Sequence, residues 1–234
     1  MVRTILLSIL LASSLSWVAC GDDSSSGGDS DSDSDSDTDA DSDTDTDVDT
    51  DTDTDSDTGG EPYIDENGFM VTNEIEFTTN MGTFVIGLYG DDCPITVTNF
   101  LNYVDDGFFD GLIFHRVIVD FMIQGGGYDE DLTEQPTDPA IELELLDGLS
   151  HTEGVIGMAR TPALDSATSQ FFINVADNTG LDTSGGGYAR FGMTRSDSDY
   201  DVVEAISLVP VEATGISEAQ PVDPVIITSA VRLF

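Results

Sequence analysis

Short stretches of alternating apolar and polar residues dominate the chain from Asn73 onward. The first two span residues 75–77 and 84–88, and this period of two is typical of strands with one buried face. Further strands are expected at 112–118, 121–124, 154–159, 171–175, 190–194 and 225–232. Glycine-rich or acidic loops separate these stretches, which favours an antiparallel β fold.

Two segments change to the periodicity of an amphipathic helix. Pro94 opens the first, and Asp91 and Asp92 are expected at its positive end. Its apolar positions, spaced i, i+3, i+4 and i+7, are Val97, Phe100, Leu101 and Val104. The second helix is expected at 199–208, with a capping pattern at 198–201. Many short strands with two helices predict a barrel or sandwich closed at its ends by helices.

The N-terminus has the layout of an export signal. Within residues 1–19 a single early cation, Arg3, precedes an apolar stretch at 5–15 and a small-residue approach to Cys20. Residues 17–21 resemble a bacterial lipobox, which implies a lipid anchor on Cys20 and a membrane-anchored lipoprotein of a bacterial envelope. The alternative is ordinary signal cleavage, which would give a secreted or periplasmic protein.

The segment 20–61 is predicted to be a disordered acidic spacer. Aspartate alternates with serine or threonine from Asp22 onward, so the tract has nothing to bury. Specific calcium binding is the alternative, because the Asp-x-Asp-x-Asp spacing also opens an EF-hand loop. The glycine and the final glutamate of that loop are missing. The folded domain is expected at 62–234.

The strong excess of acidic over basic residues excludes some classes of function. The 234 residues include 47 acidic residues against 6 arginines and no lysine, a net charge of −41. Nucleic acid is excluded as a partner, because phosphate binding needs a cationic face. His115 and His151 have no cysteine or histidine at ligand spacing, so we expect no metal, and nothing calls for a cofactor. We expect a monomer.

The run 114–127 carries the most information. It reads Phe-His-Arg-Val-Ile-Val-Asp-Phe-Met-Ile-Gln-Gly-Gly-Gly and is followed by a second block at 157–161 and 166–175. Together these blocks resemble the two core motifs of the cyclophilin family of peptidyl-prolyl isomerases. The resemblance covers about residues 72–232. It implies a mainly β fold, an eight-stranded antiparallel closed barrel capped by two α-helices.

The resemblance also implies roles for individual residues. Arg116 would act on the substrate as the catalytic donor, because its guanidinium stays charged and presents several N–H groups in one plane. The proline pocket would be formed by Phe121, Met122, Phe172 and Leu181. The substrate groove would be lined by His115, Gln124, Ala159, Arg160, Gln170 and Tyr188. In an arbitrary β-domain, the aromatic residues among these would be core and Arg116 a surface ion-pair partner.

The roles of the two histidines and two departures from the family pattern also bear on the predicted site. His115 borders the pocket or only satisfies a local hydrogen bond, and His151 is expected to be structural. Many cyclophilins have Pro-Gly where this chain has Val119 and Asp120. Gly180 stands where the family places an aromatic ring, which opens one wall of the site. We therefore expect weak binding of cyclosporin-like macrocycles.

Two functions from different classes remain open. The first is a peptidyl-prolyl cis-trans isomerase that acts on proline-containing polypeptides and assists the folding of exported proteins. The second is a non-catalytic module that holds proline-containing segments at the end of an acidic stalk. Retention of Arg116 favours the enzyme.

Overall fold

Strands with one buried face make up most of the fold, as the alternation of apolar residues predicts. A computed structural model describes residues 60–234. The predicted signal segment, the candidate lipidation site at Cys20 and the acidic tract up to residue 59 lie outside the described residues. Neither helix of the described part has the length and hydropathy needed to cross a membrane.

The predicted strands and both helices are present in the predicted order with shifted ends. In chain order they are β1 (Tyr63–Ile64), β2 (Met70–Val71), β3 (Asn73–Thr79), β4 (Gly82–Leu88), α1 (Pro94–Asp105), β5 (Arg116–Ile118), β6 (Met122–Gly125), β7 (Val155–Met158), β8 (Phe171–Asn174), the 3₁₀ turns η1 (Thr179–Asp182) and η2 (Ser184–Gly186), β9 (Arg190–Thr194), α2 (Asp197–Ser207), β10 (Val211–Glu212), β11 (Gln220–Pro221) and β12 (Ile227–Arg232). The short strands β1, β2, β10 and β11 and the two 3₁₀ turns were not predicted. The largest difference is at β5, which begins at Arg116 because Leu112 and Ile113 make isolated bridges only.

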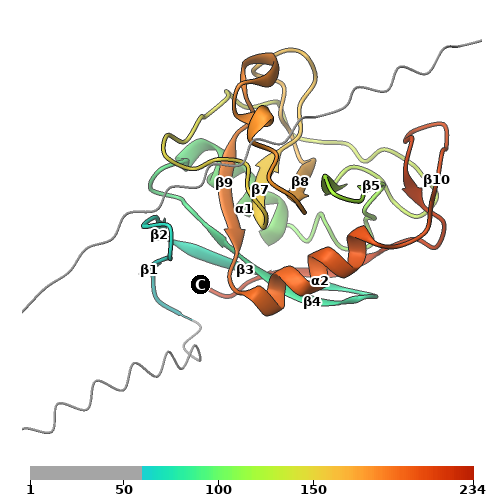
Figure 1. Ribbon diagram of the computed structural model, residues 1–234, viewed down its shortest axis with the longest axis horizontal. Helices are drawn as coiled ribbons and strands as arrows, with labels where there is room; N and C mark the ends of the chain where they lie inside the picture. The colour runs from blue at the N-terminus through green and yellow to red at the C-terminus, as the bar shows by residue number, and fades with distance from the viewer. Residues whose placement is uncertain (1–59) are drawn as a thin grey trace, which may run out of the picture. The chain divides into compact units, whose positions relative to one another are not determined.

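Eight strands form one antiparallel sheet in the order β12-β3-β4-β9-β7-β8-β6-β5. The expectation of a closed barrel is corrected, because β12 and β5 are the two edges of this sheet and do not pair with each other. Contact between the edges is limited to the segment just before β5, where the Phe114 N–H donates to the Val225 carbonyl and the Ile227 N–H to the Leu112 carbonyl, around a bridge between Ile113 and Ile226. The sheet is therefore a half-barrel, with α1 beside β12 and α2 against β4 (Figure 1).

A cluster of phenylalanine rings fills the concave side of the sheet. Phe171 lies at its centre, with its ring centroid 5.5 Å from those of Phe77, Phe100 and Phe109. All four side chains are fully buried. Edge-to-face contacts of this kind add to the burial of apolar area, so these rings hold the strands of the sheet to α1.

The turn between β5 and β6 is tight although it lacks the Pro-Gly pair that many cyclophilin-like sequences carry. The Phe121 N–H donates to the Ile118 carbonyl across 3.2 Å. Asp120 has a φ of 56°, in the left-handed region that glycine enters without strain. Aspartate tolerates this conformation better than most residues, so the turn forms and brings Phe121 to the start of β6.

The N-terminus of α1 is capped by a distant carboxylate. Pro94 occupies the first turn as predicted, but Asp91 and Asp92 are not the groups that bind the free N–H donors. Those donors, on Ile95 and Thr96, reach the two carboxylate oxygens of Glu144 at 3.1 and 2.6 Å. A negative group at this position also complements the helix dipole. The N-terminus of α1 is thus stabilised by a tertiary contact with Glu144.

Helix α2 begins two residues earlier than predicted. Its N-cap is Ser196, whose side chain accepts from the backbone N–H of Asp199. The Asp199 carboxylate is buried and accepts from the backbone N–H of Val85 on β4, at 2.8 Å. Asp199 thus belongs to the cap of the helix and also fastens α2 to the sheet.

Replacing Asp199 by alanine should leave the Val85 N–H buried without an acceptor. A buried unpaired donor costs about 1–3 kcal/mol, so we expect the free energy of unfolding in urea to fall by about 2 kcal/mol. The control is Asp201→Ala, on the exposed face of the same helix, which should change stability by less than about 0.5 kcal/mol. Equal losses in the two variants would contradict a role through Val85.

Candidate active site

The register of four strands lines up a row of side chains on the convex face of the sheet. Arg116 on β5 lies opposite Gln124 on β6, which lies opposite Phe172 on β8, which lies opposite Gly157 on β7. Directly paired residues point to the same face, so these positions form one continuous line. Phe171, one residue before Phe172, points to the other face and into the core.

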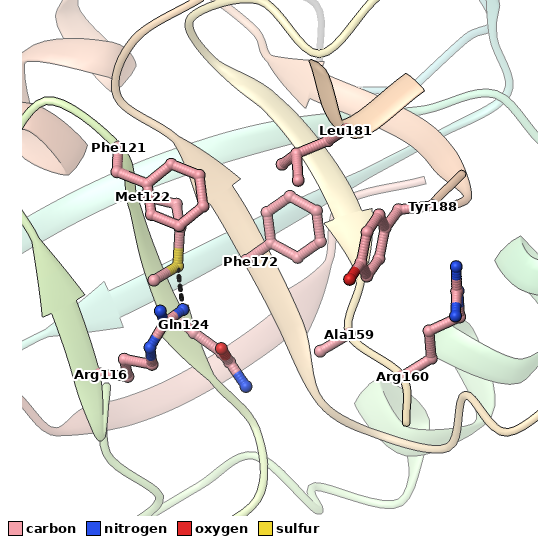
Figure 2. Close-up of a pocket in the computed structure, with 9 residues that line it drawn as sticks. All are labelled: Arg116, Phe121, Met122, Gln124, Ala159, Arg160, Phe172, Leu181 and Tyr188. Atoms are coloured by element: carbon pink, nitrogen blue, oxygen red, sulfur yellow. Dashed lines mark hydrogen bonds between the residues drawn. The ribbon is translucent and has the colours of Figure 1, made fainter. Parts of the chain in front are cut away.

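A hollow of about 230 Å³ opens over this row. Figure 2 shows the nine residues that line it, which are Arg116, Phe121, Met122, Gln124, Ala159, Arg160, Phe172, Leu181 and Tyr188. All nine are among the residues that the sequence resemblance places at the site. They come from β5, the turn before β6, β6, β8 and the segments that follow β7 and β8, so the fold gathers segments far apart in the chain.

Two expected groove residues do not line this hollow, and of these only His115 lies away from the site. Gln170 lines a neighbouring hollow, and it accepts a hydrogen bond from Gln124 at 3.0 Å. His115 is only 4% exposed and packs edge-on against Tyr128, with ring centroids 4.8 Å apart. Burial, and then the neighbouring charge of Arg116, lower the pKa of His115 to about 4. The expectation of His115 at the pocket is corrected, because adjacent residues of an extended chain point to opposite sides.

The floor of the hollow is apolar. Phe172 lies at its centre, between Met122 and Tyr188 in Figure 2, with Leu181 above the ring. The rings of Phe172 and Tyr188 meet edge to face at 5.8 Å. Phe172 and Met122 are 5% and 2% exposed, so they present one apolar face to the hollow while the rest of each side chain is packed.

The position of the Phe172 ring depends on the absence of a side chain at Gly157. A Cβ atom there would lie 2.7 Å from Cζ of Phe172, too close for any real contact. The ring therefore lies directly over the backbone of β7. His151 stacks on Phe172 at 5.4 Å between centroids, nearly parallel, so the ring is also supported from behind.

His151 is a neutral support for the pocket wall. It is fully buried, and the side-chain amide of Asn174 donates to its Nδ1 across 3.2 Å. The ring proton is therefore on Nε2, which lies 3.4 Å from the Tyr188 carbonyl. Burial, and to a lesser extent the charge of Arg190, lower the pKa of His151 to about 4, so the imidazole is uncharged at neutral pH.

Arg116 turns one edge of its guanidinium toward the hollow. Nη1 lies 3.7 Å from Sδ of Met122, the contact dashed in Figure 2. The opposite edge faces Glu218, whose Oε1 lies 2.8 Å from Nε and 2.6 Å from Nη2. The guanidinium carbon lies 5.7 Å from the centre of the Phe121 ring. The cation is thus held between a carboxylate and an aromatic face, with one amino group left toward the pocket.

Arg160 forms a wall of the hollow. It donates to the carbonyls of Gly185 and Gly187, at 2.7 Å from Nη2 in both cases. Its guanidinium carbon lies 4.5 Å from the centre of the Tyr188 ring, in cation–π contact. Because its donors are occupied by backbone oxygens, Arg160 fixes the loop that carries Tyr188.

The opposite wall is open beside Leu181. A Cβ atom on Gly180 would meet nothing within 4 Å, which agrees with the expectation that a ring is missing there. Hydrogen bonds hold the loop that carries Leu181 in place. The Leu181 N–H donates to the Asn178 carbonyl at 2.8 Å, and the Asn178 side chain donates to the Phe121 carbonyl at 2.6 Å.

Sequence reasoning assigned no part in the site to three residues that shape it, although it predicted His151 to be structural. They are Asn178, which ties the two walls together, His151, which supports Phe172, and Glu218, which pairs with Arg116 from 102 positions away. Asn178 lies in a turn segment, where asparagine is common. No local pattern marks His151 or Glu218, since their contacts exist only in the folded chain.

Comparison with known proteins places this chain in a family. Residues 74–232 match the family model of the cyclophilin type peptidyl-prolyl cis-trans isomerases. The chain is 46% identical over 157 residues to a peptidyl-prolyl cis-trans isomerase of Acinetobacter baylyi, covering 66% of this chain and 82% of that protein. It is 42% identical over 158 residues to peptidyl-prolyl cis-trans isomerase B of Escherichia coli, covering 66% and 96%.

A solved structure of a cyclophilin type isomerase has a similar fold. The crystal structure of a Cryptosporidium parvum cyclophilin type isomerase, in the presence of the dipeptide Ala-Pro, matches 68% of this chain and 97% of its own, with a TM-score of 0.59 and 25% identity. The fold, the family model and the bacterial relatives point the same way. The chain belongs to the cyclophilin family of peptidyl-prolyl cis-trans isomerases.

Proposed function

We propose that the hollow over Arg116 and Phe172 is the active site where this peptidyl-prolyl cis-trans isomerase turns Xaa-Pro bonds of its substrates. The activity follows from the family and from bacterial relatives of that name at 42–46% identity. One observation carries the choice of site. A single guanidinium edge, Nη1 of Arg116, faces an apolar floor large enough for a proline ring.

The reaction needs a hydrogen-bond donor for the proline nitrogen and an apolar surface that holds the proline ring. Rotation about an Xaa-Pro bond is opposed by a barrier of about 20 kcal/mol, because the nitrogen lone pair is conjugated with the carbonyl. A donor aimed at the proline nitrogen stabilises the twisted state, in which that lone pair is localised. Arg116 is placed to supply this hydrogen bond. Phe172, Met122 and Leu181 would hold the ring while the carbonyl side rotates.

Gln124 is suited to bind the substrate backbone. Its amide nitrogen donates to Gln170, which fixes the orientation of the side chain. Within residues 60–234 its carbonyl oxygen has no hydrogen-bond partner, so it can accept an N–H from a peptide lying in the groove. A fixed acceptor beside a fixed donor would align the substrate with little loss of freedom at the transition state.

The cellular setting is a separate proposal that rests on the sequence. The signal-like segment 1–19 and the lipobox-like approach to Cys20 support an exported protein, anchored to a bacterial envelope through Cys20, that assists the folding of other exported proteins. The 30 acids and 5 arginines of residues 61–234 favour neutral or cationic clients at low salt. The alternative of a non-catalytic proline-binding module is not favoured, because the matched relatives are named as isomerases.

Replacing Arg116 should remove most of the activity. Arg116→Ala is expected to lower kcat/KM at least about 100-fold, measured as cis-to-trans relaxation of an Ala-Pro-Phe type peptide. Arg116→Lys keeps the charge but not the planar set of donors, and should still lose about 10-fold. Arg232→Ala, which removes a surface arginine paired with Asp105, is the control and should leave the rate unchanged. An intact protein that does not accelerate relaxation would favour the binding module.

Replacing Gly157 should damage the pocket while leaving Arg116 in place. In Gly157→Ala the new methyl group would push the Phe172 ring into the hollow, so we expect kcat/KM to fall about 10-fold, mainly through a higher KM. Gly215→Ala is the matched control, because a Cβ atom there meets nothing within 4 Å. A wild-type KM in a folded Gly157→Ala protein would show that Phe172 is not part of the substrate floor.

A further inference from the structure

We propose that Glu218 is a positioning residue for catalysis, which holds the Arg116 guanidinium so that its Nη1 edge faces the substrate. This inference rests on the proposed catalytic role of Arg116 and adds a residue that neither the sequence motifs nor the pocket lining contains. Glu218 itself lies outside the hollow and would not touch the substrate.

The contacts of the guanidinium set its orientation. Nε and Nη2 lie 2.8 and 2.6 Å from the same carboxylate oxygen of Glu218, on the side away from the pocket. Nη1 lies 3.7 Å from Met122 Sδ, on the pocket side. Because the guanidinium is planar, fixing two of its nitrogens also fixes the direction of the third.

Apart from Glu218, Arg116 contacts only the Phe121 ring, at 5.7 Å, and the Met122 sulfur among the side chains described, and neither contact fixes the direction of its donors. It lies on β5, a three-residue strand at the edge of the sheet, and its side chain is 28% exposed. A free arginine side chain samples many rotamers, and a donor that is rarely in place contributes little to the transition state. Within residues 60–234, Glu218 is the only carboxylate in a salt bridge with Arg116.

The backbone around Glu218 is fixed to the strand that carries Arg116. The Val117 N–H, next to Arg116, donates to the Ala219 carbonyl, next to Glu218, across 2.8 Å. Ser217 and Ala219 are both buried, and the Ala219 N–H donates to the Ser217 hydroxyl. The glutamate thus extends from a fixed hairpin between β10 and β11, and its carboxylate is brought to the guanidinium without a search over loop conformations.

Stability does not account for the pair. The Glu218 side chain is 62% exposed, and exposed ion pairs add little to the stability of a fold. The hydrogen bond from Arg116 lowers the pKa of Glu218, so the carboxylate stays ionised at neutral pH. What the pair can do is restrict the direction in which the guanidinium points.

The test compares four variants in the peptide relaxation assay with the intact protein. Glu218→Ala should lower kcat/KM about 10-fold, with the loss in kcat, because the donor is needed in the transition state. Glu218→Gln should keep most of the activity, since its amide oxygen still accepts from Nε and Nη2. Glu212→Ala, which removes the same charge from the same hairpin, should match the wild type, and all variants should keep the wild-type melting temperature.

The fourth variant separates positioning from a general structural effect. In an Arg116→Ala background, Glu218→Ala should cause no further loss, because its only route to the reaction is gone. A further 10-fold loss of kcat/KM in that background would overturn the proposal. So would a Glu218→Ala enzyme with unchanged or higher kcat/KM, because the ion pair would then have no effect on catalysis or would oppose it. An inactive wild type would overturn the proposed function as well, so the two failures are distinguishable.

Discussion

The alternation of side chains along β8 is the constraint on which both the interior and the candidate active site depend. Phe171 points into the half-barrel, where four other phenylalanine rings surround it, and Phe172 points outward as the floor of the hollow. A slip of one residue in the pairing of β8 would exchange these faces. The buried cluster around Phe171 therefore also fixes where the pocket floor lies, and Gly157 on the neighbouring strand leaves the room that this floor needs.

Local patterns predicted much of the fold and failed at identifiable points. Alternation found the strands of the main sheet, and Pro94 marked the start of α1 correctly. The cap of α2 was placed at Ser198 rather than Ser196, because Ser196-x-x-Asp199 and Ser198-x-x-Asp201 both fit the local rule. In the structure Ser196 is the N-cap, and Asp199 also accepts a hydrogen bond from the Val85 N–H on β4, a tertiary contact that no local pattern contains. The closed barrel was implied by the family resemblance and is not what the structure shows, and alternation alone predicts strands without saying how the two edges of a sheet meet.

The residues of the candidate site also fall into a group that the sequence predicts and a group that it does not. The nine lining residues came from motif resemblance, since periodicity alone would have put Phe172 and Met122 in the core. The residues that support them could not be found from local sequence. Glu144 on the N-terminus of α1 and Glu218 beside Arg116 are carboxylates brought from distant segments, and in a chain with 30 acids after residue 60 nothing marks either one in advance. Tertiary structure selects them from many chemically equal candidates.

The pairing of β12 with β3 has a consequence for how the enzyme is made. Ile75 near the start of the domain pairs with Arg232 near its end, so the sheet is incomplete until almost the whole domain has been synthesised. Strand pairings this far apart in sequence form late and slowly, because the long intervening loop has to be ordered first. The sheet of each molecule is therefore completed only after β12 has been synthesised. Until then, the prolines of that same chain isomerise without help from its own active site.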